Sequence, residues 1–345
     1  MNARICHETL IIANVMMIFV NRKLSRGRTN FIMKTKPLIV GCVVLGMTTL
    51  ALLFGMVLVN QVGSVPANVQ SIEVEGNRWS YVFSKPDGKA KGLILAMHGG
   101  GGSGPQFDES AQWSQKATAA GFAVVLPTGL PSRPALPGNF RTNPQVWNSG
   151  QLNSRSPRTK IDDLAALEQI LSRCQAELGD VPLFLTGHSN GAGMSFRVAR
   201  EWPDKVTAMG MMSGNLHTTT GEPGKKPIPT LWIVGEKDPL TPFAGGTTKM
   251  EVWGTEKENR PVLETAAEWA KWNGFAGEVA RSEGKQGVRE YRYGNVVWVW
   301  ECLGHGHAWP GGKKDELPES IMGPDVTQVD ATSEIVKFFA EHLGK

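Results

Sequence analysis

The pattern that most restricts the fold is an alternation of two kinds of segment from residue 92 onward. Short, predominantly apolar runs lie at 92–100, 122–129, 181–189, 206–214, 229–238 and 296–303, and a further strand is expected at 288–294. Longer segments with helical apolar spacing lie at 107–121, 161–179, 190–202, 262–275 and 331–344. Strands without polar residues are buried on both faces, which is typical of a mostly parallel sheet. The sequence therefore predicts an α/β fold with helices covering both faces of one central sheet.

The N-terminal part differs from the rest in charge and hydropathy. Residues 1–36 carry seven basic residues and one acid, and residues 38–59 form a run of 22 residues without charge. Such a run is long enough to cross a bilayer, and the basic flank before it predicts that the chain after it lies outside the cytoplasm. A signal peptide and an uncleaved membrane anchor fit this run equally well.

These observations predict a domain organisation for all 345 residues. We expect a basic cytoplasmic leader at 1–36, of which 1–32 precede an alternative start at Met33. A signal peptide or anchor follows at 37–60, then a linker at 61–70 and a catalytic domain at 71–345. The expected location of that domain is extracytoplasmic, either periplasmic or secreted, with membrane contact through the N-terminal segment if it is uncleaved. Without its leader the chain is slightly acidic, which argues against nucleic acid as a partner.

A serine stands at the end of one predicted strand, in the sequence Gly187-His188-Ser189-Asn190-Gly191. This G-x-S-x-G pattern lies between a strand and a helical segment, where it forms a sharp turn that exposes the serine. The two glycines let the backbones of strand and helix pass closely. The sequence predicts Ser189 as a catalytic nucleophile, and the alternative is a Gly/Ser turn without chemistry.

A run of glycines follows the strand at 92–100, within the segment 98–102. Glycines at this place let backbone N–H groups point at a bound oxygen, so we expect an oxyanion hole from Gly99, Gly100 and Asn190. The same run also fits the G-x-G-x-x-G pattern of dinucleotide-binding proteins. That kind of site needs an acidic residue at the end of the next strand, which is missing here, so we expect no cofactor.

The partners of the serine follow it in chain order, first an acid and then a histidine. Glu236 and Asp238 follow one strand, and either carboxylate could orient an imidazole; His305 and His307 follow the last strand. The cluster of Cys302 with these histidines also has atoms that bind zinc. A zinc site needs three or four convergent ligands, and no other cluster completes a known spacing, so we expect no metal.

The motifs together resemble the polyhydroxybutyrate depolymerase-like esterase family, which is related to feruloyl and acetylxylan esterases of the α/β-hydrolase fold. The resemblance covers about residues 72–343 and is carried by LILAMHGGGGSG, WNSG followed by IDDLAAL, GHSNGAGMSFRVA, GEKDPLTPFAGG and GHAWPGG. Its Asp-Pro-x-x-Pro loop implies Asp238 as the acid. Its His-x-Trp-Pro-Gly-Gly loop implies His307, and not His305, as the base. The role of His305 stays open.

The resemblance implies a serine carboxylic-ester hydrolase that works through an acyl-enzyme. The implied substrates are polyhydroxyalkanoate oligomers or acyl and feruloyl esters of glycans. Two alternatives stay open: a serine peptidase of the same fold, and a membrane-anchored binding protein on an inactive hydrolase fold. Family members often carry cysteine pairs around the WNSG segment, and this chain has none there, so another interaction has to hold that loop.

The expected access to the site follows from segment lengths. Only 15 residues, 215–229, separate two neighbouring strands, which is too few for a large cap domain, so we expect an open site. Trp147, Phe243 and Trp309 are candidates to line it. Cys174 and Cys302 are the cysteines outside the leader, and export would permit a disulfide between them. The sequence predicts neither that bond nor an oligomeric state.

Overall fold

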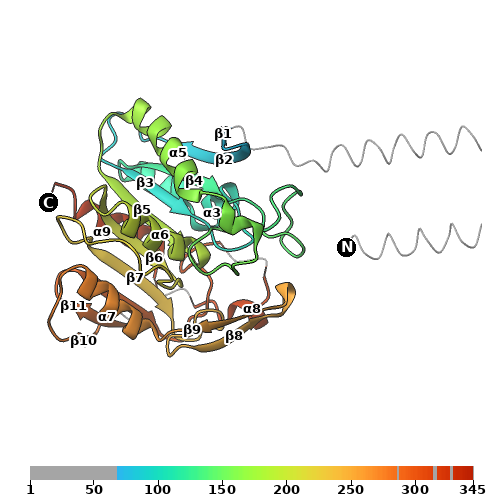
Figure 1. Ribbon diagram of the computed structural model, residues 1–345. Helices are drawn as coiled ribbons and strands as arrows, with labels where there is room; N and C mark the ends of the chain where they lie inside the picture. Colours follow the sequence, from blue (N-terminus) through green and yellow to red (C-terminus); the bar gives the residue numbers. More distant parts are fainter. Residues whose placement is uncertain (1–67, 286, 314–316, 327–328, 345) are drawn as a thin grey trace, which may run out of the picture. The chain divides into compact units, whose positions relative to one another are not determined.

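The computed structural model describes residues 68–285, 287–313, 317–326 and 329–344 (Figure 1). The predicted leader and signal peptide or anchor, and most of the predicted linker, lie outside the described residues. Among the described residues, no helix combines the length and the apolar character that a membrane crossing requires.

The described chain builds a ten-stranded central sheet. Its strands lie in the order β1 (Val69–Val74), β2 (Asn77–Ser84), β4 (Ala123–Thr128), β3 (Leu93–Met97), β5 (Leu183–His188), β6 (Val206–Met212), β7 (Thr230–Gly235), β12 (Val297–Cys302), β11 (Val288–Tyr293) and β10 (Ala280–Glu283). The strands from β4 to β12 run parallel to one another. Antiparallel strands extend both edges. The predicted mostly parallel sheet is therefore confirmed, whereas β1, β2 and β10 were not predicted.

Helices cover both faces of the sheet, as predicted (Figure 1). One face packs against α5 (Asp163–Leu178), α6 (Asn190–Glu201) and α7 (Val262–Trp272). The other packs against α3 (Gly104–Ala111), α4 (Trp113–Ala119) and α9 (Ala331–Ala340). Strand β5 shows the cause, because Leu183 and Leu185 belong to the first core and Phe184 to the second. Successive side chains of a strand point to opposite faces, so a continuous apolar strand supplies both cores.

Two details of the helices and loops differ from the sequence prediction. The single helix expected at 107–121 is divided into α3 and α4, because Gln112 adopts a left-handed φ of 58° between them. The segment 215–229 contains no helix or strand, which agrees with the predicted absence of a large cap. A short hairpin between β7 and α7 was not predicted. It consists of β8 (Gly246–Met250), η2 (Glu251–Trp253) and β9 (Thr255–Asn259).

Candidate active site

Ser189 occupies a strained turn between β5 and α6. Its φ of +52° lies in a region that residues other than glycine rarely adopt. A Cβ atom at Gly187 would lie 2.4 Å from the backbone of Gly191, and one at Gly191 would lie 2.1 Å from the carbonyl oxygen of Met97. Both glycines of the G-x-S-x-G pattern are therefore required for the close approach of strand and helix.

The glycine loop after β3 lies directly against this turn. A Cβ atom at Gly99 would lie 3.4 Å from Cβ of Ser189, and one at Gly100 would lie 3.9 Å from Cβ of Asn190. As the first residue of α6, Asn190 has a backbone N–H without an intrahelical acceptor. The described residues offer no backbone acceptor to the N–H of Gly100 either. The geometry thus brings the three predicted oxyanion-hole residues next to the serine.

Trp147 holds these donor groups in place. Its indole Nε1 donates to the carbonyl oxygen of His98 at 3.0 Å, and its backbone N–H donates to Oδ1 of Asn190 at 2.6 Å. The Asn190 amide in turn donates to the carbonyl oxygen of Trp147 at 3.1 Å. The indole is completely buried and stacks on Trp79. It therefore has no exposed surface to offer a substrate, in contrast to the lining role expected from the sequence.

His98 stabilises the glycine loop through two hydrogen bonds of its imidazole ring. Its Nδ1–H donates to the carbonyl oxygen of Gly99 at 2.7 Å, and its Nε2 accepts from the N–H of Gly129 at 2.9 Å. Burial lowers the pKa of His98 to about 4, and the hydrogen bond to Gly99 opposes this only partly. His98 is therefore neutral at physiological pH, with a tautomer that its two partners fix.

Asp238 and His307 form a buried pair. Nδ1 of His307 lies 2.9 and 2.8 Å from the two carboxylate oxygens of Asp238. Oδ1 also accepts from the backbone N–H groups of Leu240 and Thr241, at 2.8 and 2.7 Å. Burial opposes the charge of Asp238, but His307 and these donors outweigh it and hold the pKa of the carboxyl below its usual value. A carboxylate here fixes the proton of His307 on Nδ1.

The second residue of the serine motif ties the serine turn to this pair. Nε2 of His188 donates to the carbonyl oxygen of His307 at 2.8 Å, and the two imidazole rings lie 4.9 Å apart. Burial lowers the pKa of His188 to about 3, and the nearby His307 adds to this effect. The neutral His188 thus attaches the backbone of His307 to the residue that precedes Ser189. Trp309 packs edge-on against His188 and is only 7% exposed. It supports the site from within the core.

The remaining candidates of the last loop have structural partners. His305 is buried, its Nε2–H donates to the carbonyl oxygen of Ala308 at 2.7 Å, and its Nδ1 accepts from the N–H of Val326 at 3.0 Å. These hydrogen bonds attach His305 to the loop that carries His307, the predicted base. Glu236, the rival acid, accepts the N–H of Gly304 at 2.9 Å. Among the described residues, no cluster of His, Cys, Asp or Glu is arranged to hold a metal ion.

Both described cysteines, Cys174 and Cys302, are free and buried. Phe243, the third aromatic candidate, is half-buried and packs against Tyr291 at 5.6 Å between ring centroids.

Two aromatic residues near the predicted oxyanion hole were not identified from the sequence. The ring of Trp253, in the β8–β9 hairpin, would lie 3.2 Å from a Cβ atom at Gly100. Its Nε1 donates to the carbonyl oxygen of Phe140 at 2.6 Å, and the two rings lie 5.5 Å apart. Both side chains are half-buried, so they form a partly accessible wall over the glycine loop. The only signal in the sequence was an isolated aromatic residue within each of two polar segments.

A buried ion pair holds the loop that carries Trp147. Arg158 donates to Oδ1 of Asp163 at 2.6 Å and to the carbonyl oxygen of Val146 at 3.0 Å, and both charged side chains are fully buried. Oδ2 of Asp163 accepts the N–H of Asn148 at 2.7 Å. Burial raises the pKa of Asp163, while Arg158 and the Asn148 N–H oppose that shift. The segment WNSG (147–150) has no cysteine pair to hold it, and this buried ion pair is the interaction that holds it instead.

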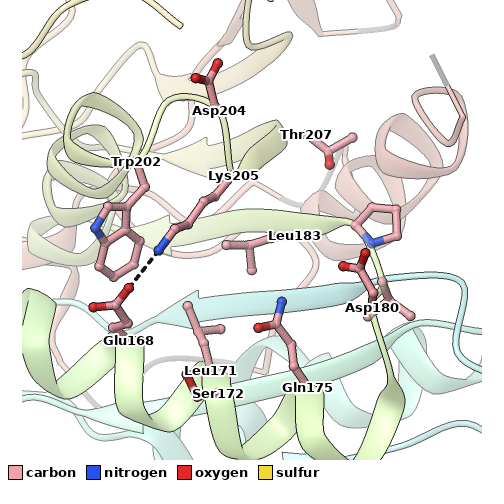
Figure 2. Close-up of a pocket in the computed structure, with 12 residues that line it drawn as sticks. Glu168, Leu171, Ser172, Gln175, Asp180, Leu183, Trp202, Asp204, Lys205 and Thr207 are labelled. Atoms are coloured by element: carbon pink, nitrogen blue, oxygen red, sulfur yellow. Dashed lines mark hydrogen bonds and ion pairs between the residues drawn. The ribbon is translucent and has the colours of Figure 1, made fainter.

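A separate surface pocket lies at the opposite end of β5 (Figure 2). It is lined by residues at the start of β5 and β6, including Asp180, Leu183 and Thr207, and an ion pair of 2.7 Å joins Glu168 to Lys205 beside it. Since Ser189 follows the last residue of β5, the pocket is separated from it by the length of that strand.

Comparisons with known proteins agree with this geometry. No model of a protein family matches the chain. The protein named "Putative esterase NocK" from Nocardia uniformis subsp. tsuyamanensis is 27% identical over 273 residues, which are 73% of this chain and 74% of that protein. Feruloyl esterase C from Emericella nidulans is 30% identical over 183 residues, which are 50% of this chain and 59% of that protein.

The solved structure of S-formylglutathione hydrolase from Agrobacterium tumefaciens superimposes with a TM-score of 0.51. It is 12% identical, and the match covers 80% of this chain and 95% of that one. This similarity concerns the fold, whereas the sequence relatives are named as esterases. The predicted similarity to esterases, among them a feruloyl esterase, is thus confirmed, and these findings support a carboxylic ester hydrolase of the α/β-hydrolase fold.

Proposed function

We propose that the chain hydrolyses its ester through an acyl-enzyme on Ser189, with His307 as the base and Asp238 as the acid that orients it. The observation that carries this proposal is the buried Asp238–His307 pair, tied by His188 to the strained serine turn. With the proton of His307 held on Nδ1, its Nε2 is the nitrogen that can accept a proton from the serine hydroxyl.

In the first step Ser189 Oγ attacks the ester carbonyl carbon while its proton passes to Nε2 of His307. The carbonyl oxygen becomes negatively charged and is stabilised by the N–H groups of Gly99 or Gly100 and of Asn190. The bond to the leaving alcohol then breaks, and the alcohol takes the proton from His307. A water molecule repeats the sequence on the acyl-enzyme, which releases the acid and restores the serine.

The comparisons support an ester as the substrate, and our proposal also names the kind of ester. We infer that the enzyme acts on polyhydroxyalkanoate oligomers or on acyl and feruloyl esters of glycans. The short segment 215–229 supports access for an ester on a larger molecule, and a relative named feruloyl esterase C supports the second class. Export to an extracytoplasmic location is part of the same proposal and rests on the apolar run at 38–59.

The test is turnover of p-nitrophenyl acetate by the purified protein and by its Ser189→Ala variant. We expect turnover by the wild type, a burst of nitrophenol in the first cycle, and no turnover by the variant. A wild type without activity would refute the assignment and favour a binding protein. The matched p-nitroanilide distinguishes the peptidase alternative, because an ester hydrolase should leave the amide intact.

A further inference from the structure

The β8–β9 hairpin forms a separate two-stranded sheet outside the central sheet (Figure 1). Its base is attached to the loop after β6, because the amide of Asn215 donates to Oδ1 of Asn259 at 3.1 Å. Its turn places Trp253 over Gly100. The hairpin therefore extends from the loop after β6 to the glycine loop that follows β3. The face of the hairpin that is turned toward these two loops is called its inner face.

The ladder of the hairpin separates its charged residues into two faces. Lys249 lies opposite Glu256, at 3.3 Å between Nζ and the carboxylate, on the outer face. On the inner face, the buried Asn259 donates to Oγ1 of Thr248 at 2.9 Å. Lys257 is the direct cross-strand neighbour of Thr248. Since residues two apart share a face of a strand, Lys257 points the same way as Asn259, toward the body of the enzyme.

Lys257 differs from the outer lysine in its surroundings. Its side chain is half-buried, and no residue in the described part of the chain forms an ion pair or hydrogen bond with it. Burial lowers its pKa to about 8, and the charge of Asp238 opposes this effect. Burial and then the charge of Lys257 lower the pKa of His217 to about 3. Lys257 is therefore within electrostatic reach of both Asp238 and the loop after β6.

An ammonium group in this position still carries its charge at neutral pH. Partial removal of a charge from water costs free energy unless an opposite charge compensates it. The carboxylate of Asp238 compensates this cost only in part, because it forms no ion pair with Lys257 and its oxygens already accept hydrogen bonds from His307 and from backbone N–H groups. The partner that would complete this arrangement is an anion that enters from solvent with the substrate.

We propose that Lys257 is a specificity-determining residue that binds a carboxylate carried by the ester substrate. The inference rests on the proposed ester hydrolysis at Ser189 and adds a charge requirement to it. Of the two substrate classes considered above, hydroxy acid oligomers end in a free carboxylate, whereas acetyl and feruloyl esters of neutral glycans have none. The ester bond to be cleaved would thus lie a few bonds from an anionic end group.

The test uses pairs of esters that differ only in a carboxylate and its uncharged carboxamide analogue. Monomethyl glutarate and methyl glutaramate carry the group on the acid side, and 3-acetoxybutyrate and 3-acetoxybutyramide carry it on the alcohol side. In at least one pair we expect kcat/KM of the wild type to favour the carboxylate by about tenfold, a typical size for a partly buried ion pair. The preference should weaken at high salt.

Lys257→Met should reduce that ratio of kcat/KM to about one, and Lys257→Arg should retain most of it. Lys249→Met, on the outer face of the same hairpin, is the matched control and should leave the ratio at its wild-type value. Equal kcat/KM values within both pairs, or a preference that survives Lys257→Met, would overturn the proposal.

A binding measurement separates this proposal from the proposed function. Calorimetry on Ser189→Ala, which needs no turnover, should show tighter binding of the carboxylate member of the preferred pair. If p-nitrophenyl acetate is not hydrolysed, the assignment of the reaction fails, and the binding comparison still decides the role of Lys257. Equal binding of both members would reject it even in an active esterase.

Discussion

Replacement of Trp147 by phenylalanine tests whether this residue positions the oxyanion hole or contacts the substrate. The change removes the indole N–H, so the buried carbonyl oxygen of His98 loses its donor. An unpaired buried polar group costs about 1–3 kcal/mol, and the cavity left by the smaller ring adds roughly 1–3 kcal/mol. We expect a total loss of about 2–6 kcal/mol in the free energy of unfolding, the sum of these two terms.

The matched control is Trp232→Phe. Trp232 is also fully buried, in β7, but its Nε1 has no hydrogen-bond partner among the described residues. The control therefore loses the same atoms without leaving an acceptor unpaired, and it should cost less stability. It should leave kcat unchanged, because it does not contact the oxyanion loop.

The assay is steady-state hydrolysis of p-nitrophenyl acetate together with denaturant unfolding. A displaced oxyanion donor acts on the transition state, so Trp147→Phe should lower kcat by about 10- to 100-fold with little change in KM. A rise in KM at constant kcat would show that Trp147 contacts the substrate, and it would refute the positioning argument.

Three further changes test other parts of the site. Asp238→Asn should lower kcat by about 10⁴ without loss of fold, because the amide no longer holds the proton of His307 on Nδ1; intact kcat in a pre-steady-state assay would contradict this. Gly306→Ala should destabilise the protein by more than about 1 kcal/mol and reduce activity, since its Cβ would lie 2.2 Å from the carbonyl oxygen of Met322; an unchanged melting temperature would argue against the packing. His98 should make the fold acid-sensitive: the unfolded chain takes up a proton below about pH 6.5, but the folded one only near its pKa of about 4. The contribution of His98 to stability should therefore fall by about 3 kcal/mol between pH 6.5 and 4, and the buried His188 and His217 should add to this fall; a denaturation midpoint independent of pH would refute it.

The sequence predicted the parallel strands well because each is apolar on both faces, as in β5. The position of the serine turn was also predictable, because the close backbone contacts on either side of Ser189 leave no room for a side chain at positions 187 and 191. Both positions therefore have to be glycine, and the motif becomes visible in the sequence. In the sequence only the resemblance to a family separated the predicted acid and base from Glu236 and His305, which have the same functional groups. The hydrogen bonds of these side chains support that choice, and they depend on residues distant in sequence, such as Val326.

The parts that could not be predicted share a physical cause. The β8–β9 hairpin has sequences without an apolar face, so its strands depend on a contact with Asn215 far away in the chain. Trp147 was expected near the substrate because an aromatic residue in a polar loop gives no indication of burial. The structure buries it because its ring and backbone contact His98 and Asn190 at the same time.

The Arg158–Asp163 pair has a consequence for how and where such an enzyme can mature. A cross-link between cysteines forms only after oxidation, and often needs an isomerase, whereas an attachment by charge forms as soon as the loop collapses onto α5. With both described cysteines unpaired, the attachment of the loop that carries Trp147 does not depend on the thiol redox state of the compartment. We therefore expect that reductants such as dithiothreitol leave the described part of the chain folded, which denaturant unfolding with and without the reductant would check.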